Sequence, residues 1–139
     1  MKEYKFITNP DELDMVKDIW YFELFPGKKR NEDSVFLSEY SMEVVEDIFA
    51  ELDKHYDHYG STVYNEDQIK IIEQELLKRK SEIENTGSYT FIEGKLNVFY
   101  YNELMKNMGK NKYKIIKMLE ELIDWITTIK EEEISLIGL

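Results

Sequence analysis

The strongest helical signal in the sequence is a row of isoleucine and leucine side chains near its C-terminal end. From about residue 111 to residue 130, apolar residues recur every three or four positions, which is the spacing of one helix face. A face this broad must be covered by other elements, so we expect this helix to form the spine of the core. Gly109 is expected to break the chain before the helix, and Asn111 to cap it. The apolar face comprises Ile115, Ile116, Leu119, Leu122, Ile123, Ile126 and Ile129.

A second amphipathic stretch predicts a strongly acidic helix. It begins at Ser38 or Ser41 and runs to about Tyr56. Its apolar positions are Val45, Ile48, Phe49, Leu52 and Tyr56, and its acidic positions are Glu39, Glu43, Glu46, Asp47, Glu51 and Asp53. So many like charges on one helix require a basic group nearby, either inside the protein or on a partner.

A third helix is predicted to open at Asn65. Gln68 follows three residues later, so the two side chains match a capping box, in which each accepts a hydrogen bond from the other residue's backbone amide. The helix is expected to run to about Glu84, because Asn85, Thr86 and Gly87 form a stop signal.

Alternating β-forming residues predict strands at 3–8 and 134–139, the second placed beside the first. Between them, residues 9 and 10 (Asn-Pro) predict a helix start, followed by a stripe of Leu13, Val16, Ile19 and Trp20. Residues 21–25 fit either a helix or a strand. Residues 89–100 fit a hairpin, in competition with a slightly favoured helix that runs from about Leu96 to Asn107.

Together these patterns predict one domain over residues 1–139 with a helix-dominated α+β fold. We expect four or five helices, short strands at the termini and, as an alternative, the hairpin near 89–100. At 139 residues the chain is long enough to bury one core.

Charge is concentrated in the N-terminal half. The net charge is −11, with 17 acidic and 7 basic residues in 1–67, but 12 acidic and 11 basic residues in 68–139. An acidic surface repels phosphate backbones, so we expect no nucleic acid partner. It favours a basic protein partner instead.

Residue types that are missing narrow the functional classes further. The sequence has no cysteine, which excludes disulfides and thiolate metal sites and fits a cytoplasmic location. No stretch approaches the roughly 20 apolar residues of a membrane span, so we expect no membrane association. No cofactor signature is present, and we expect none.

The segment 55–65 brings together both histidines, several tyrosines and a glycine corner, so any site is expected here. One interpretation is a protein-binding surface that continues the acidic helix and consists of Glu43, Glu46, Asp47, Asp53, Tyr56, Asp57 and Tyr59. The rival is a small enzyme or ligand-binding domain whose pocket is formed by His55, Asp57, His58 and Thr62. A third interpretation is a structural or regulatory homodimer built on an exposed apolar helix face.

The segment does not match known metal-binding or catalytic sequence motifs. Aligning Gly60 with the glycine of a calcium-binding EF-hand loop places His55 and Tyr59 where carboxylates are needed. Two histidines three residues apart supply only two of the ligands that zinc requires, so we expect no metal site. The sequence contains no nucleophile elbow and no His-Glu-x-x-His pattern, and we assign no catalytic residue.

Short sequence patterns carry a resemblance. The acidic helix ends in Tyr56-Asp57-His58-Tyr59-Gly60-Ser61-Thr62, and the sequence closes with Ile134-Ser135-Leu136-Ile137-Gly138-Leu139. In residues 38–84, the last helix and its tail, the chain resembles a family of small, largely uncharacterised acidic bacterial proteins. In size and acidity it is also similar to the immunity proteins that neutralise bacterial toxins. This resemblance implies occlusion of a basic toxin surface by the acidic helix and the adjoining tyrosines.

Overall fold

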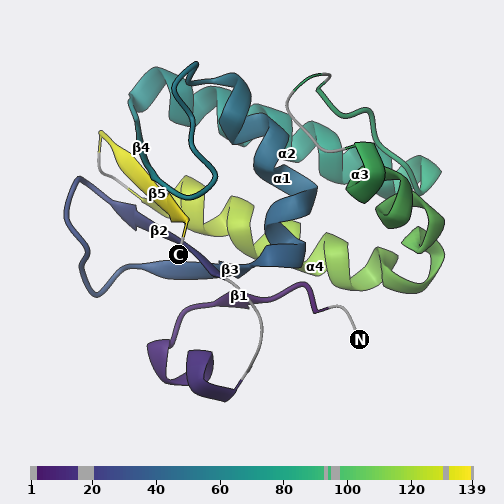
Figure 1. Ribbon diagram of the computed structural model, residues 1–139, viewed down its shortest axis with the longest axis horizontal. Coiled ribbons are helices and arrows are strands. Elements are labelled where there is room, and N and C mark those ends of the chain that lie inside the picture. Colours follow the sequence, from purple (N-terminus) through teal and green to yellow (C-terminus); the bar gives the residue numbers. More distant parts are fainter. Residues whose placement is uncertain (1–2, 16–20, 93, 95–97, 130–131, 139) are drawn as a thin grey trace.

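The computed structural model describes residues 3–15, 21–92, 94, 98–129 and 132–138. Within these residues the fold is α+β, with four α-helices and one five-stranded antiparallel sheet (Figure 1). The elements, in chain order, are β1 (Phe6–Ile7), the 3₁₀-helix η1 (Pro10–Met15), β2 (Tyr21–Pro26), β3 (Val35–Ser38), α1 (Glu39–Glu51), β4 (Ser61–Tyr64), α2 (Glu66–Thr86), α3 (Val98–Lys106), α4 (Met108–Thr128) and β5 (Ile134–Gly138). The helix-dominated α+β prediction is therefore confirmed.

The strands follow the order β1-β3-β2-β5-β4, so β5 lies in the interior of the sheet. Leu136 of β5 is opposite Leu24 of β2 on one side and opposite Thr62 of β4 on the other. The predicted C-terminal strand is confirmed, but its predicted place beside the first strand is wrong, because β1 pairs with β3.

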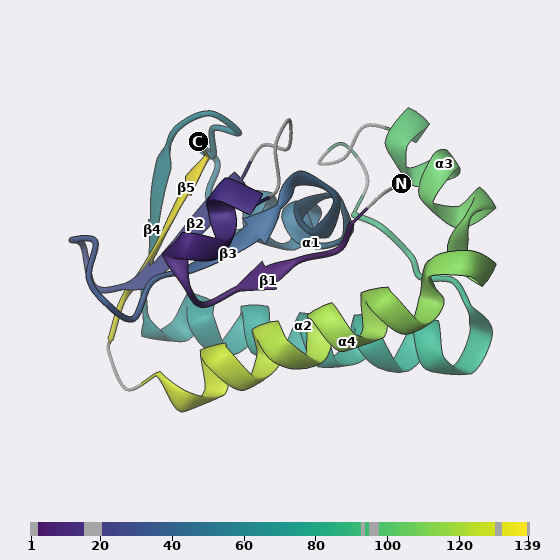
Figure 2. The same cartoon turned by 90° about the horizontal axis from the view of Figure 1, so that it is seen from below.

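The helices lie mainly on one side of this sheet. Figure 2 shows α2 and α4 side by side along that face. The apolar stripe of α4 is buried there, with Ile115, Leu119, Leu122 and Ile126 at most 3% exposed. The predicted role of this helix as the spine of the core is confirmed.

The ambiguous segment 21–25 is a strand, since β2 runs from Tyr21 to Pro26 and is buried throughout. Phe22 and Leu24 belong to the main core, whereas Tyr21 forms a smaller cluster with Ile7 and Phe36 on the opposite face. Both faces of the strand are covered, so its residues are continuously apolar rather than alternating. This is why periodicity did not distinguish a strand from a helix.

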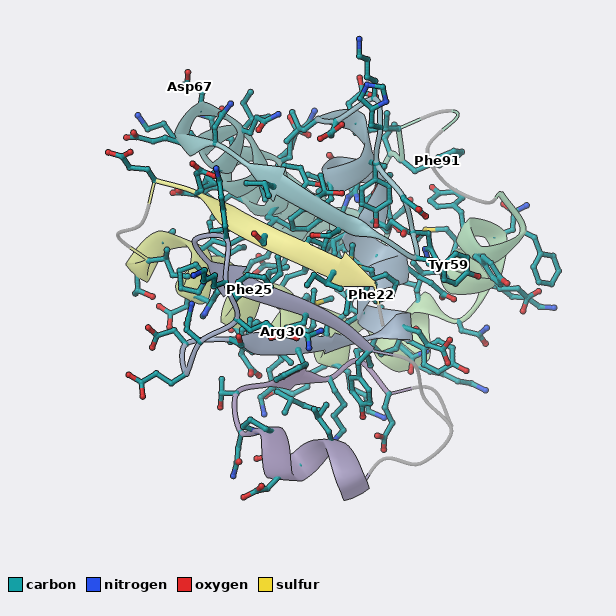
Figure 3. All side chains as sticks on the ribbon, turned by 60° about the vertical axis from the view of Figure 1, so that its left-hand side comes forward. Phe22, Phe25, Arg30, Tyr59, Asp67 and Phe91 are labelled. Carbon is teal, nitrogen blue, oxygen red and sulfur yellow. The ribbon has the colours of Figure 1, made fainter. Side chains whose placement is uncertain are left out.

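Glu23 is the exception within β2, because it is a buried carboxylate. Arg30 reaches back from the turn after the strand and places its Nε 2.9 Å from the Glu23 Oε1. Figure 3 shows Arg30 lying across the outer face of the sheet. The loop 27–33, which carries three consecutive basic residues, thus supplies the counter-charge for the strand before it.

The predicted hairpin near 89–100 is absent from the described residues. Residues 89–92 stay outside the sheet, because side chains rather than a neighbouring strand satisfy their backbone. Tyr101 Oη donates to the Tyr89 carbonyl (2.6 Å), and Ile92 N donates to Asp47 Oδ2 (3.0 Å). The slightly favoured helix is present as α3, although residues 95–97 lie outside the described residues.

Three further boundaries differ from the predictions. Gly109 does not break the chain but lies inside α4, and Asn107 rather than Asn111 is the N-cap residue, without a side-chain capping bond. The N-terminal helix is the short η1, and Val16, Ile19 and Trp20 of its predicted stripe lie outside the described residues. Strand β3 was not predicted.

Candidate functional site

The predicted site segment is neither a helix end nor a simple corner. Helix α1 stops at Glu51, five residues before the predicted Tyr56, and strand β4 intervenes before α2. The alternation of exposed Ser61 and Val63 with buried Thr62 and Tyr64 is the period-2 pattern of a strand. The residue types do not show this alternation, because Ser61 and Val63 share one face; only the β-forming residues Thr62, Val63 and Tyr64 pointed to a strand, which was not predicted.

Residues 52–60 fold into two successive aspartate turns. Asp53 Oδ1 accepts a hydrogen bond from the His55 amide (2.8 Å), and Asp57 Oδ1 accepts one from the Tyr59 amide (2.9 Å). Aspartate side chains that bond the backbone two residues ahead favour turns over helix, which explains the early end of α1.

Two glycines allow this loop to close against the sheet. A Cβ at Gly60 would lie 3.0 Å from the Asp57 side chain, and one at Gly138 would overlap the His58 carbonyl oxygen. Gly138 also donates its amide to the Gly60 carbonyl (3.0 Å). The C-terminal end of β5 therefore holds residues 58–60 in place.

A polar cluster centred on Glu46 anchors the loop to α1. Glu46 Oε2 accepts a hydrogen bond from Tyr56 Oη (2.7 Å) and lies 2.5 Å from His58 Nδ1. The His58 ring also meets the edge of Phe22 at a centroid distance of 5.0 Å. Burial, and secondarily Glu46, raises the pKa of Tyr56 well above its ordinary value, so this tyrosine is a neutral donor.

Tyr59 projects from this anchored loop into solvent. Its side chain is 80% exposed, and its ring meets the His58 ring edge-on at 4.7 Å. Asp57 beside it is exposed and Asp53 is half-buried. We call Asp53, Tyr56, Asp57, His58 and Tyr59 the Tyr59 surface.

Asp47 does not belong to any surface, which corrects its predicted interface role. It is fully buried and forms a bidentate pair with Arg79 of α2, at 2.5 and 2.8 Å. Arg79 also donates to the Val44 carbonyl (2.8 Å) and lies over the Tyr89 ring, 4.3 Å from its centroid. The basic group expected near the acidic helix is thus, for Asp47, inside the protein.

The remaining predicted interface residues lie on α1. Glu43 is half-buried, and the side chain of Glu46 is 16% exposed because it serves the His58 and Tyr56 cluster. Neither carboxylate is as accessible as Asp57. The part of the acidic helix that faces solvent is therefore smaller than its sequence indicates.

The residues of the rival pocket do not converge. His55 and Asp57 are exposed, whereas Thr62 is 5% exposed and lies opposite Leu136, on the core side of β4. A pocket of about 330 Å³ does lie beside the loop, but of the four proposed residues only His58 lines it. Its lining consists of Glu46, Ala50, Asp53, Lys54, Tyr56, His58 and Gly94.

Other classes of site are not seen in the described part of the chain. It contains no group of three or more histidine or carboxylate side chains arranged to hold a metal ion. No helix in the described ranges is long and apolar enough to cross a membrane. Comparison with protein-family models, with curated proteins and with solved structures found no match to this chain.

Proposed function

We propose that this chain is a non-enzymatic protein-binding module, most concretely a cytoplasmic immunity protein that neutralises a basic toxin by occluding its surface. The observation that carries this proposal is an 80% exposed Tyr59 on a loop fixed by hydrogen bonds and flanked by carboxylates. Tyrosine is enriched at interface hot spots, because it offers a large rigid contact area and a polar tip.

Preorganisation strengthens the argument for binding. An exposed aromatic side chain on a mobile loop would lose conformational freedom on binding and so lose affinity. Here the two aspartate turns, the Glu46 cluster and the close approach of Gly138 fix the loop before any partner arrives. Most of that entropic cost is therefore met during folding.

Charge supplies the preference for a basic partner. Residues 51–67 contain five carboxylates and one lysine. Such a surface accelerates encounter with a positively charged protein and slows encounter with an acidic one. An immunity protein must meet its toxin before the toxin meets its target, so a fast association rate suits this function.

The test begins with affinity capture from native lysate, followed by association kinetics with the captured basic protein. The Asp53→Asn/Asp57→Asn double variant keeps both turn acceptors but removes two charges. We expect its association rate to fall about tenfold or more at low ionic strength and to approach the parent rate at high salt. An unchanged rate at low salt, or capture of no basic protein, would refute the proposal.

Asp124→Asn is a control for charge loss outside the loop, because it removes one charge, against two in the double variant, from an exposed position on α4. Tyr59→Ala should act differently from the charge variants. Loss of an anchor side chain accelerates dissociation while leaving the salt dependence of association intact.

A second candidate function is small-ligand binding in the pocket beside the loop. The specific observation is that Glu46, Tyr56 and His58 form a hydrogen-bonded cluster in the wall of a cavity of about 330 Å³. A small molecule found by affinity capture whose binding is lost in His58→Ala but kept in His55→Ala would favour this candidate over the first.

A further inference from the structure

Strand β4 forms one edge of the sheet. In the strand order β1-β3-β2-β5-β4 it pairs with β5 on one side and with no described strand on the other. Figure 2 shows β4 at the outside of the sheet, beyond β5. The strand leads directly out of the Tyr59 surface, so the two features form one continuous region.

The backbone of β4 presents hydrogen-bonding groups at this edge. The Gly60 carbonyl accepts from Gly138 of β5, and successive residues of a strand alternate between its two sides. Thr62 and Tyr64 therefore direct their amides and carbonyls toward β5, and Ser61 and Val63 direct theirs outward. Both outward residues are exposed, Val63 by 39% of its surface.

Most features that usually protect an edge strand are missing from β4, although the strand has only four residues. Natural proteins block such edges with proline, lysine, bulges or very short strands. Ser61–Tyr64 contains no proline or lysine and pairs with β5 in continuous register. The opposite edge strand, β1, has only two residues and packs near α4. The two edges of the sheet are therefore not equivalent.

The charges around β4 specify what kind of chain fits there. Figure 3 shows Tyr59 and Asp67 at opposite ends of the strand. Asp57 is exposed near the first end, and Glu66 and Asp67 are exposed at the second. Lys70 is 3.9 Å from Glu66, but both side chains are largely in solvent, where such a pair contributes little. An added strand would thus have carboxylates at both ends.

We infer that the β4 edge receives an extended segment of the basic partner, which adds a sixth strand to the sheet. Backbone bonds to Ser61 and Val63 supply the pairing, and lysine or arginine side chains of the segment lie near Asp57 and Asp67. This inference rests on the proposed function for the identity of the partner, and adds its conformation and its docking strand.

The direct test uses the full chain and a short synthetic peptide that alternates lysine and valine. Amide hydrogen exchange of Ser61 and Val63 should slow about tenfold at a peptide concentration roughly ten times its Kd. Two control peptides should give no slowing: one with glutamate in place of lysine, and one with alternate backbone amides methylated. Unchanged exchange at both residues with the lysine peptide would overturn the inference.

A second copy of this chain is the competing occupant. In that case exchange at Ser61 and Val63 would slow with rising protein concentration in the absence of peptide. That result would overturn the assignment of a basic partner segment.

Two substitutions at Val63 test strand addition separately from the proposed binding function. Val63→Pro removes an outward amide without breaking a bond to β5, whereas Val63→Ala keeps the amide. We expect Val63→Pro to weaken binding of the captured partner about tenfold relative to Val63→Ala. Equal binding of the two variants, together with a slow Asp53→Asn/Asp57→Asn association, would refute strand addition while leaving the proposed function intact. If Val63→Pro does not fold, the methylated peptide provides the same comparison.

Discussion

Among single residues, Asp47 is the one whose removal we expect to destabilise the fold most. Both oxygens of its carboxylate accept hydrogen bonds from Arg79, and Oδ2 also accepts one from the Ile92 amide. The side chain is fully buried. A buried pair of this kind contributes modest net stability while it is intact. It becomes costly when one partner is removed, because the other charge is left uncompensated.

We therefore predict that Asp47→Ala lowers the free energy of unfolding by about 3–5 kcal/mol in denaturant titration. Glu51→Ala removes an exposed carboxylate from the same helix and should change the value by no more than about 0.5 kcal/mol. Adding Arg79→Met to Asp47→Ala should recover part of the loss. A loss below about 1 kcal/mol for Asp47→Ala would contradict this account of the pair.

Asp47 also shows where inference from single residues fails. The sequence places it among surface acids of similar spacing, and nothing local distinguishes it from Glu43 or Glu46. Its partner lies 32 residues away on another helix. By contrast, the capping role of Asn65 was predicted correctly, since its partner Gln68 is only three residues away.

At the scale of elements, the junction between α1 and α2 depends on one capping box. Asn65 Oδ1 accepts from the Gln68 amide (2.9 Å), and Gln68 Oε1 accepts from the Asn65 amide (2.8 Å). Gln68 also donates its Nε2 to the Leu52 carbonyl (2.8 Å) at the end of α1. Gln68 at the start of α2 thus satisfies the hydrogen-bonding capacity of a backbone carbonyl at the end of α1.

Asn65→Ala should accordingly lower the free energy of unfolding by about 1 kcal/mol, within a range of about 0.5–2 kcal/mol. Asn65→Ser retains a capping oxygen and is the matched control, with a smaller loss expected. Thermal or denaturant unfolding monitored by circular dichroism measures both. An equal loss in the two variants would show that the cap itself is not responsible.

Elements with strong local signals were predicted well, and those defined by long-range pairing were not. The capping box and Gly87, which adopts a left-handed φ of 71°, bound α2 as expected. β3 and β4 are each only four residues long, and neither was predicted. Such short strands are stabilised by their neighbours in the sheet, and the order of strands in the sheet differs from their order along the chain.

At the scale of the whole molecule, buried tyrosines make stability sensitive to alkaline pH. Burial, with a smaller contribution from Glu43, raises the pKa of Tyr4 to about 12. The unfolded chain loses this proton near pH 10. The contribution of Tyr4 is therefore complete below pH 10 and is lost as the pH rises from about 10 toward 12.

Tyr4→Phe should consequently reduce the dependence of unfolding free energy on pH above 10, by up to about 1.4 kcal/mol per pH unit. Denaturant titrations at a series of alkaline pH values provide the measurement. Tyr113→Phe, at a side chain that is 80% exposed, is the control. Identical pH profiles for the parent protein and Tyr4→Phe would exclude Tyr4 as a source of the alkaline loss. Tyr56, Tyr64 and Tyr89 also have raised pKa values, so some loss persists in Tyr4→Phe.

The interior position of β5 has a consequence for the timing of assembly during synthesis. Residues 134–138 leave the ribosome after every other described element, yet β4 joins the sheet only through them. Until then, residues 61–64 have no sheet neighbour, and the glycine that holds residues 58–60 has not been made. The Tyr59 surface is therefore complete only after β5 has been synthesised and has entered the sheet between β2 and β4.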